Sequence, residues 1–182
     1  MRNDNPYKII STKIVYKNPW ITVNEDKIIH PDGHKGVYGV VNTNDSVAIL
    51  PVNENEEILL IYAYSYPSKK WHWELPAGGV DNDNYLDAAK RELFEETGMK
   101  SNNLEQIGLV RPMDGLMKEK MALIVAKDLK QEEIPEADDN GVIDKCKFFD
   151  LDTIRKMIKT GMIDEGATIT GLYYYELRRK NE

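Results

Sequence analysis

The sequence predicts an α+β fold, because strand-like segments lie on both sides of one central helical segment and two more helical segments end the chain. The strand-like segments are short and rich in β-branched and aromatic residues, whereas the helical ones carry apolar residues three and four apart. A chain of 182 residues can bury a core, and no glycine-serine or proline-rich linker divides it. One main domain with a small accessory element is therefore expected.

The accessory element comes first in the chain. Strands are predicted over residues 8–17, 20–29 and 35–41, and a Pro-Asp-Gly turn between the last two predicts a hairpin. We therefore expect an N-terminal antiparallel β subdomain over residues 1–43 and a main domain over residues 44–182.

The main domain is predicted to begin with two strands, and more strands follow the central helix. The first of the two final helices is predicted to end at Gly161. The second is predicted to end in a basic segment, whose positive charges suit the negative end of the helix dipole. The predicted strands are residues 46–52, 57–67, 106–112, 120–129 and 143–151, and the final helices are residues 151–160 and 167–180.

The charge balance excludes some partners. With 31 acidic and 24 basic residues, the net charge of −7 disfavours nucleic acid and anionic membranes as main partners. Cys146 is the single cysteine, so no intramolecular disulfide can form, and we expect its thiol to be buried as a small apolar group. No signal peptide and no run of 18 apolar residues is present, which predicts a soluble cytoplasmic protein.

The central helix is predicted to start at Asp83 as N-cap and to end at Gly98. Leu86, Ala89 and Leu93 form a narrow apolar stripe that is expected to face the core.

Three glutamates of the same helix are predicted to share another face. Glu92, Glu95 and Glu96 stand at i, i+3 and i+4, where like charges repel and destabilise the helix. A hard divalent cation such as Mg²⁺, which binds carboxylates, water and phosphate oxygens, would explain this cost. The alternative is a solvated acidic face that Arg91 neutralises.

The segment RELFEETGM, residues 91–99, resembles the second half of the Nudix box, with all seven specified positions matched. The preceding WELPAG, residues 73–78, is similar to the lead-in of the ADP-ribose pyrophosphatase branch, and the likeness extends over most of the chain. The first half of the box departs from the pattern. Asp83 takes the place of a glutamate, and Gly78 lies thirteen residues before Arg91 instead of fourteen, so the loop is one residue short.

The resemblance implies a Nudix fold, a mixed β-sheet between α-helices, and metal-dependent hydrolysis of a nucleoside diphosphate linked to another moiety. It implies that Glu92, Glu96 and the backbone carbonyl of Ala77 bind Mg²⁺, or Mn²⁺, and that Glu95 is a further ligand or supports the others. Arg91 would orient a glutamate through its planar fork. The catalytic candidates are thus Arg91, Glu92, Glu95 and Glu96.

The sequence does not identify the residue that acts as the general base. Relatives often take it from a loop before the last strand, here residues 132–144, but Val142 falls at the expected position. The candidates in that loop are Glu136, Asp138, Asp139 and Asp144.

Trp20 and Tyr38 fall where similar enzymes sandwich the base, in N-terminal strands that relatives pack across a dimer. The resemblance therefore implies a homodimer, although both residues could equally be core or interface aromatics. Gly78 and Arg111 complete the candidate substrate contacts. Ser65 stands where relatives tend to have arginine, which leaves the substrate open.

ADP-ribose, hydrolysed to AMP and ribose 5-phosphate, is the leading candidate substrate. Alternatives are a nucleotide sugar such as GDP-mannose or a dinucleotide. A further alternative is a non-catalytic Nudix-like module that binds a nucleotide, because one fold can serve several functions.

Overall fold

A computed structural model describes residues 4–81, 84–132 and 142–180 of the chain. These residues form two compact units, one made of residues 1–44 with 111–119 and one made of residues 45–110 with 120–182. The sequence did not predict that the loop Arg111–Glu119 would join the N-terminal strands. The assignment of these strands to dimerisation stays a prediction.

The first unit is a three-stranded antiparallel sheet in the order β1-β2-β3, as predicted. Gly33 has φ of 93° in the hairpin turn between β2 and β3, a conformation that glycine adopts without strain. The loop 111–119 is tied to β3, because the Val41 N–H donates to Leu116 O at 2.9 Å and the Tyr38 hydroxyl donates to Gly115 O at 3.1 Å. The strands are β1 (Lys8–Lys17), β2 (Thr22–Ile29) and β3 (Lys35–Asn42).

The second unit contains a mixed four-stranded sheet in the order β7-β4-β10-β9, in which only β4 and β10 run parallel. A second sheet, antiparallel, has the order β12-β5-β6, and β11 pairs with β8. The strands are β4 (Ser46–Pro51), β5 (Ile58–Ser65), β6 (Lys70–Glu74), β7 (Ala77–Gly79), β8 (Met99–Lys100), β9 (Asn103–Val110), β10 (Met121–Lys127), β11 (Lys130–Gln131) and β12 (Ile143–Phe149).

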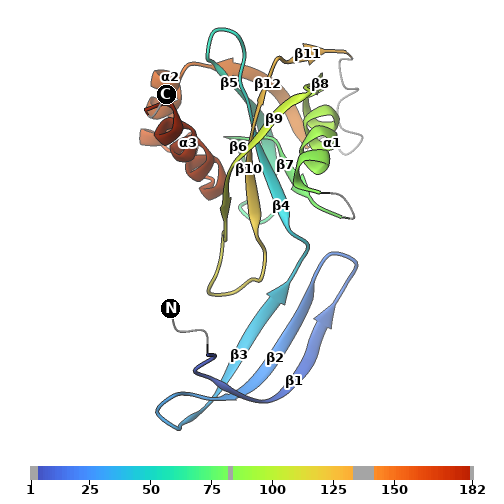
Figure 1. Cartoon of the computed structure of the whole chain (residues 1–182), viewed down its shortest axis with the longest axis vertical. Helices are drawn as coiled ribbons and strands as arrows, with labels where there is room; N and C mark the ends of the chain where they lie inside the picture. Colours follow the sequence, from blue (N-terminus) through green and yellow to red (C-terminus); the bar gives the residue numbers. More distant parts are fainter. Residues whose placement is uncertain (1–3, 82–83, 133–141, 181–182) are drawn as a thin grey trace. The chain divides into compact units, whose positions relative to one another are not determined.

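The helices of this unit are α1 (Tyr85–Thr97), α2 (Leu151–Lys159) and α3 (Gly166–Arg179). Alternate residues of β4 point to opposite faces of the sheet, so Val47 and Ile49 pack with α1, whereas Ala48 and Leu50 pack in the cluster that contains α2 and α3. Figure 1 shows α1 on one side of β4 and β10 and the other two helices on the opposite side. The predicted Nudix architecture, a mixed sheet between helices, is therefore confirmed.

The start of α1 differs from the prediction. Asn84 is the N-cap, with an extended backbone at φ −83° and ψ 166°, and its side chain accepts hydrogen bonds from the N–H groups of Leu86 and Asp87. The predicted cap Asp83 lies outside the described residues. Gly98 ends the helix in the left-handed region at φ 67°, as predicted.

Two burial predictions were wrong. Of the predicted apolar stripe of α1, Leu86 is exposed, whereas Ala89 and Leu93 are buried as predicted, together with Ala88 and Thr97. Cys146 is also exposed, because it lies on β12 at the edge of the second sheet. Its Sγ lies 3.6 Å from the carbonyl oxygen of Glu96, and the surrounding protein together with the charge of Glu96 raises the pKa of the thiol to about 11.

Candidate active site

The short strand β7 forms one wall of the candidate site, and hydrogen bonds to β4 fix its position. Ala77 pairs with Ala48, the N–H of Ile49 donates to Pro76 O at 2.8 Å, and the N–H of Val80 donates to Asp45 O at 2.8 Å. Backbone groups of this wall are therefore held by a strand that is buried on both faces.

Side chains of α1 reach across to the backbone of β7 at both ends of the strand. The Ala77 N–H donates to Glu96 Oε2 at 2.9 Å, and Arg91 Nη2 donates to Gly79 O at 2.8 Å. Charge-assisted hydrogen bonds of this length are among the stronger ones in proteins. The helix and the glycine strand are thus joined by the same residues that the sequence predicted to be catalytic.

Glu92 lies against Gly78, between these two attachments. A Cβ atom on Gly78 would stand 2.0 Å from Glu92 Cδ, so the carboxylate occupies space that only glycine leaves open at this position. The side chain of Glu92 is only 12% exposed. Burial raises the pKa of Glu92, Arg91 lowers it, and the nearby charges of Glu95 and Asp81 raise it again, with a net upward shift.

Arg91 holds two glutamates at once. Its Nη1 donates to Glu92 Oε1 at 2.6 Å and to Glu95 Oε2 at 3.2 Å, while Nη2 is used on Gly79 O. The side chain of Glu95 is 54% exposed, so its carboxylate is far more accessible to solvent than that of Glu92. The predicted orienting role of Arg91 is consistent with this geometry, in which two nitrogens of its planar fork serve three oxygen acceptors.

The residues present fit a hard divalent cation by their chemistry. Glu92, Glu96 and the Ala77 carbonyl offer oxygen ligands of the kind that Mg²⁺ prefers, and Glu92 lies mostly buried beside the backbone of β7. Within the described parts of the chain, no three His, Cys, Asp or Glu side chains are gathered closely enough to hold a metal ion by themselves. Mg²⁺ commonly uses one or two carboxylates and takes its other ligands from water and substrate phosphates.

Asp45 and Tyr85 fix the other end of α1 to the sheet, and sequence reasoning did not find them. Tyr85 Oη donates to Asp45 Oδ2 at 2.6 Å, and the N–H of Lys120 donates to Asp45 Oδ1 at 2.9 Å. Burial would raise the pKa of Asp45, but the hydrogen bonds from Tyr85 and Lys120 lower it overall. The same bond, with burial, raises the pKa of Tyr85 to about 12.

We expect Tyr85→Phe to lower the free energy of unfolding at neutral pH by about 1–2 kcal/mol, because Asp45 loses a charge-assisted partner. The raised pKa of Tyr85 means that its contribution to stability is complete below the ordinary tyrosine pKa of 10.0 and is lost as the pH rises towards about 12. Urea unfolding between pH 8 and 12 measures both effects. A wild-type loss of stability above pH 10 that persists unchanged in the variant would contradict the assignment.

The predicted base-stacking residues and Arg111 belong to the first unit. Trp20 lies in the turn between β1 and β2 and is 78% exposed, which excludes the core alternative for it. Tyr38 is 40% exposed, with its hydroxyl on Gly115 O, and Arg111 pairs with Asp114 at 3.4 Å. All three side chains therefore present surface to the solvent.

Of the candidate bases, Glu136, Asp138 and Asp139 lie outside the described residues. Asp144 is exposed at the start of β12, and its carboxylate lies 3.1 Å from Lys145 Nζ. The sequence did not choose among the four, and the assignment of the base to this loop stays a prediction.

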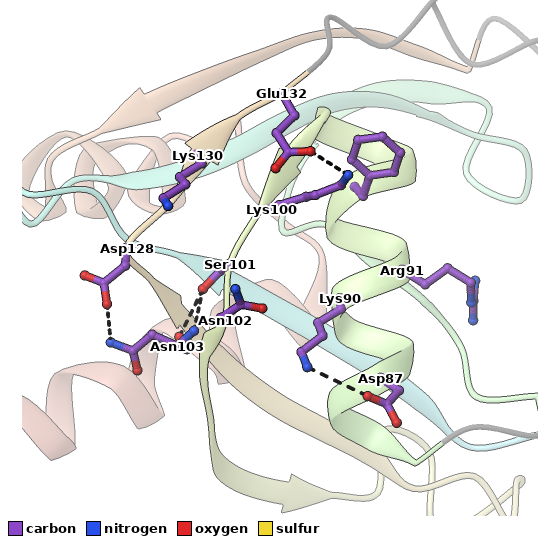
Figure 2. A pocket seen from close by; sticks show the side chains of 11 residues that line it. Asp87, Lys90, Arg91, Lys100, Ser101, Asn102, Asn103, Asp128, Lys130 and Glu132 are labelled. Carbon is purple, nitrogen blue, oxygen red and sulfur yellow. Dashed lines mark hydrogen bonds and ion pairs between the residues drawn. The ribbon is translucent and has the colours of Figure 1, made fainter.

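A pocket of about 690 Å³ lies on the outer side of α1, where Lys90 and Phe94 face the β8–β9 turn and β11. Figure 2 shows Lys90, Lys100 and Lys130 around it, with Lys100 paired to Glu132, and Arg91 directed away from these lysines. Glu92 and Glu96 do not line this pocket, but Arg91, which binds both Glu92 and Glu95, does.

The carboxylates of α1 thus lie against the glycine-containing strand β7 within an α+β architecture. The family model described as NUDIX domain matches residues 42–168, and the model described as nucleoside diphosphate sugar hydrolase N-terminal domain matches residues 7–41. The chain belongs to the Nudix family and is a Nudix hydrolase related to ADP-ribose pyrophosphatases. Nudix hydrolases generally act with divalent metal ions.

Some relatives are distant in sequence but match nearly the whole chain. The chain is 24% identical to the ADP-ribose pyrophosphatase of Mycobacterium tuberculosis over 93% of this chain and 83% of the relative. It is 26% identical to the methanol dehydrogenase activator of Bacillus methanolicus over 94% of this chain and 93% of the relative. A crystal structure of an ADP compounds hydrolase superposes with a TM-score of 0.86 at 21% identity, covering 100% of this chain and 98% of the other, which shows the fold.

Proposed function

We propose that the chain hydrolyses the diphosphate bond of ADP-ribose to AMP and ribose 5-phosphate. The observation that carries this proposal is the placement of Glu92 and Glu96 against the backbone of β7, where Arg91 and the Ala77 N–H hold them. The kinship with ADP-ribose pyrophosphatases over most of the chain supports the choice of substrate.

In this reaction a water oxygen attacks one phosphorus atom, the phosphoanhydride P–O bond breaks, and the water proton passes to a base. The base is one of the four loop candidates, Glu136, Asp138, Asp139 or Asp144. Bound Mg²⁺ would polarise the diphosphate and neutralise charge on the leaving phosphate. Glu92, Glu96 and the Ala77 carbonyl would hold that ion.

The residues of the chain supply positioning. Arg91 fixes Glu92 and Glu95 on one side of the site, and the Ala77 N–H fixes the carboxylate of Glu96 on the other. Gly78 leaves room for the Glu92 carboxylate to approach the strand. Such preorganisation lowers the barrier because the groups need not rearrange as charge develops.

A nucleotide sugar is the second candidate substrate. The match of residues 7–41 to a nucleoside diphosphate sugar hydrolase N-terminal domain favours it, and Ser65 at an expected arginine position leaves room for a different moiety. Both candidate substrates contain the diphosphate bond that is hydrolysed, so the same carboxylate site could act on either one.

The direct test is incubation of the purified protein with ADP-ribose and a panel of nucleotide sugars, with Mg²⁺, with Mn²⁺ and with a chelator. AMP plus ribose 5-phosphate, formed only with metal, is the expected result by chromatography. If GDP-mannose is cleaved faster than ADP-ribose, the preferred substrate is a nucleotide sugar. Absence of cleavage of every member would contradict the proposed function.

Trp20→Ala is expected to raise the Michaelis constant for ADP-ribose about tenfold, with a smaller effect on kcat, if its exposed ring stacks on the adenine. Trp71→Ala is the matched control, because Trp71 is a partly exposed tryptophan that stacks within the second unit on Tyr62. Equal Michaelis constants for the Trp20 variant and the wild type would remove Trp20 from the substrate site.

We also propose that the first unit forms a homodimer, in a cytoplasmic protein. The whole of β1 is exposed, and its apolar side chains include Ile9, Ile14 and Tyr16, which a monomer would leave in water. Among the described residues no helix is long and apolar enough to span a membrane.

Light scattering is expected to give twice the chain mass of 20.9 kDa, and Ile14→Lys is expected to shift the protein towards monomer. Lys13→Ala, on the same strand, should leave the mass unchanged. A monomeric wild type at micromolar concentration would contradict the homodimer.

A further inference from the structure

A hollow of about 570 Å³ lies on the second unit between β6, β12 and α2, and none of the residues that form the site on β7 and α1 lines it. Its floor is apolar. Trp73 from β6 and Phe149 from β12 meet edge to face, with ring centroids 4.9 Å apart and planes at 83°. Met157 from α2 and Met162, which follows that helix, complete the floor.

Three lysines line the hollow with their aliphatic stems, and the ammonium group of one of them, Lys145, lies 3.1 Å from Asp144 Oδ2. Lys145 and Lys147 alternate along β12, so both point to the same side of the sheet, and Lys156 comes from α2. Lys147 Nζ lies 5.2 Å from the ring centroid of Phe149, and Lys145 Nζ lies 6.0 Å from that of Trp73. Of the residues that the structure describes, no acidic one lines the hollow. This concentration of positive charge occurs in a chain with a net charge of −7.

The other polar groups of the lining are already used. The hydroxyl of Thr153 donates to Asp150 Oδ2 at 2.8 Å, and that of Thr160 donates to Lys156 O at 3.0 Å. Protection of an edge strand would account for the lysines of β12. It does not account for Lys156, which lies on a helix, or for the apolar floor that the stems of the three lysines border.

We propose that this hollow binds a small anion with an apolar body, namely an aromatic or acyl group that carries a carboxylate or phosphate. The volume falls in the range of small-molecule sites, which are mostly apolar with a few polar groups that fix orientation. Here the lining is almost wholly apolar, and the ammonium groups of Lys147 and Lys156 would supply the polar contacts at its rim. The apolar body covers Trp73, Phe149 and the methionines, and the anionic end pairs with Lys147 and Lys156.

The test uses anilinonaphthalene sulfonate, an apolar anion whose emission is excited by energy transfer from tryptophan. In the Trp20→Phe, Trp71→Phe background, Trp73 is the single tryptophan left of three. We expect saturable binding of one probe per chain with emission sensitised by Trp73. Combined Lys147→Glu and Lys156→Glu should weaken this binding by about tenfold or more, because two attractive charges become repulsive.

Lys159→Glu is the matched control, because Lys159 ends the same helix but does not line the hollow. It should change the affinity less than about twofold, since exposed charges outside the site are screened by salt. Circular dichroism establishes that each variant is folded. Equal affinity of the Lys147/Lys156 variant and the control, or probe emission without sensitisation by Trp73, would overturn the proposal.

Competition separates the two sources of such an anion. Displacement of the sensitised probe by phenyl phosphate supports an aromatic phosphate, and displacement by octanoate supports an acyl carboxylate. Inorganic phosphate alone should not displace it, because it has no apolar body. Two outcomes would overturn the proposal. One is that inorganic phosphate displaces the probe as effectively as phenyl phosphate does, and the other is that neither phenyl phosphate nor octanoate displaces it. Hydrolysis does not enter this test, so its failure leaves the proposed function unaffected.

Discussion

Glu96→Gln is expected to lower turnover of ADP-ribose by about two to three orders of magnitude, the loss typical of removing one preorganised electrostatic group. The amide oxygen of glutamine can still accept the hydrogen bond that the Ala77 N–H donates to Glu96. The side chain therefore keeps its shape and its contact with β7, and only the negative charge is lost. We expect the free energy of unfolding to change by less than about 1 kcal/mol.

Initial rates across a range of Mg²⁺ concentrations measure this effect, together with urea unfolding of the same preparations. Asp87→Asn provides the matched control, because Asp87 is an exposed carboxylate of the same helix whose partners are Asn84 and Lys90 rather than β7. That variant should retain nearly full activity. Turnover equal to that of the wild type in the folded Glu96→Gln variant would show that Glu96 has no role in the reaction and would contradict the proposed site.

Gly78→Ala is expected to lower kcat by about 10- to 100-fold while it leaves the protein folded. The new Cβ would stand 2.0 Å from Glu92 Cδ, so the carboxylate must move away from β7 and from its place beside Arg91. A displacement of about 1 Å in a catalytic group can cost about 100-fold in rate. The group displaced is the end of a flexible side chain, so we expect a stability loss below about 2 kcal/mol.

Gly79→Ala tests the same strand one residue further on. Nothing lies within 4 Å of a Cβ at Gly79, and its carbonyl remains available to Arg91. Steady-state kinetics of the two variants should therefore differ strongly, although both replace a glycine by alanine in β7. Similar rates for the two variants would show that the space beside Glu92 has no effect on catalysis.

Local sequence signals were sufficient to predict an element wherever its structure depends mainly on its own residues. The Pro-Asp-Gly turn gave the hairpin of β2 and β3, Gly98 gave the end of α1, and the Nudix-box residues indicated the functional helix. The short strands β7, β8 and β11 were not predicted, because two or three residues carry no periodic pattern and form a strand only when a partner is present.

The apolar face of α3 illustrates what periodicity misses. Ile169, Leu172, Tyr173 and Leu177 have helical spacing, yet only Leu172 of these is buried. The helix instead turns Gly171 and Tyr175 to the core, since a Cβ at Gly171 would lie 2.9 Å from Leu75 and the Tyr175 hydroxyl donates to Glu56 at 2.8 Å. Close approach through glycine and one long-range hydrogen bond outweighed the apolar pattern.

The sequence by itself determined the fold class, the family and the helix that carries the carboxylates, because these depend on residue type and spacing along one segment. The tertiary structure alone decided which partners those carboxylates have. The contacts of Glu96 with Ala77, of Glu92 with Gly78 and of Tyr85 with Asp45 join residues 14 to 40 positions apart. Such contacts depend on how β7 and β4 pack under α1, and no local pattern specifies that packing.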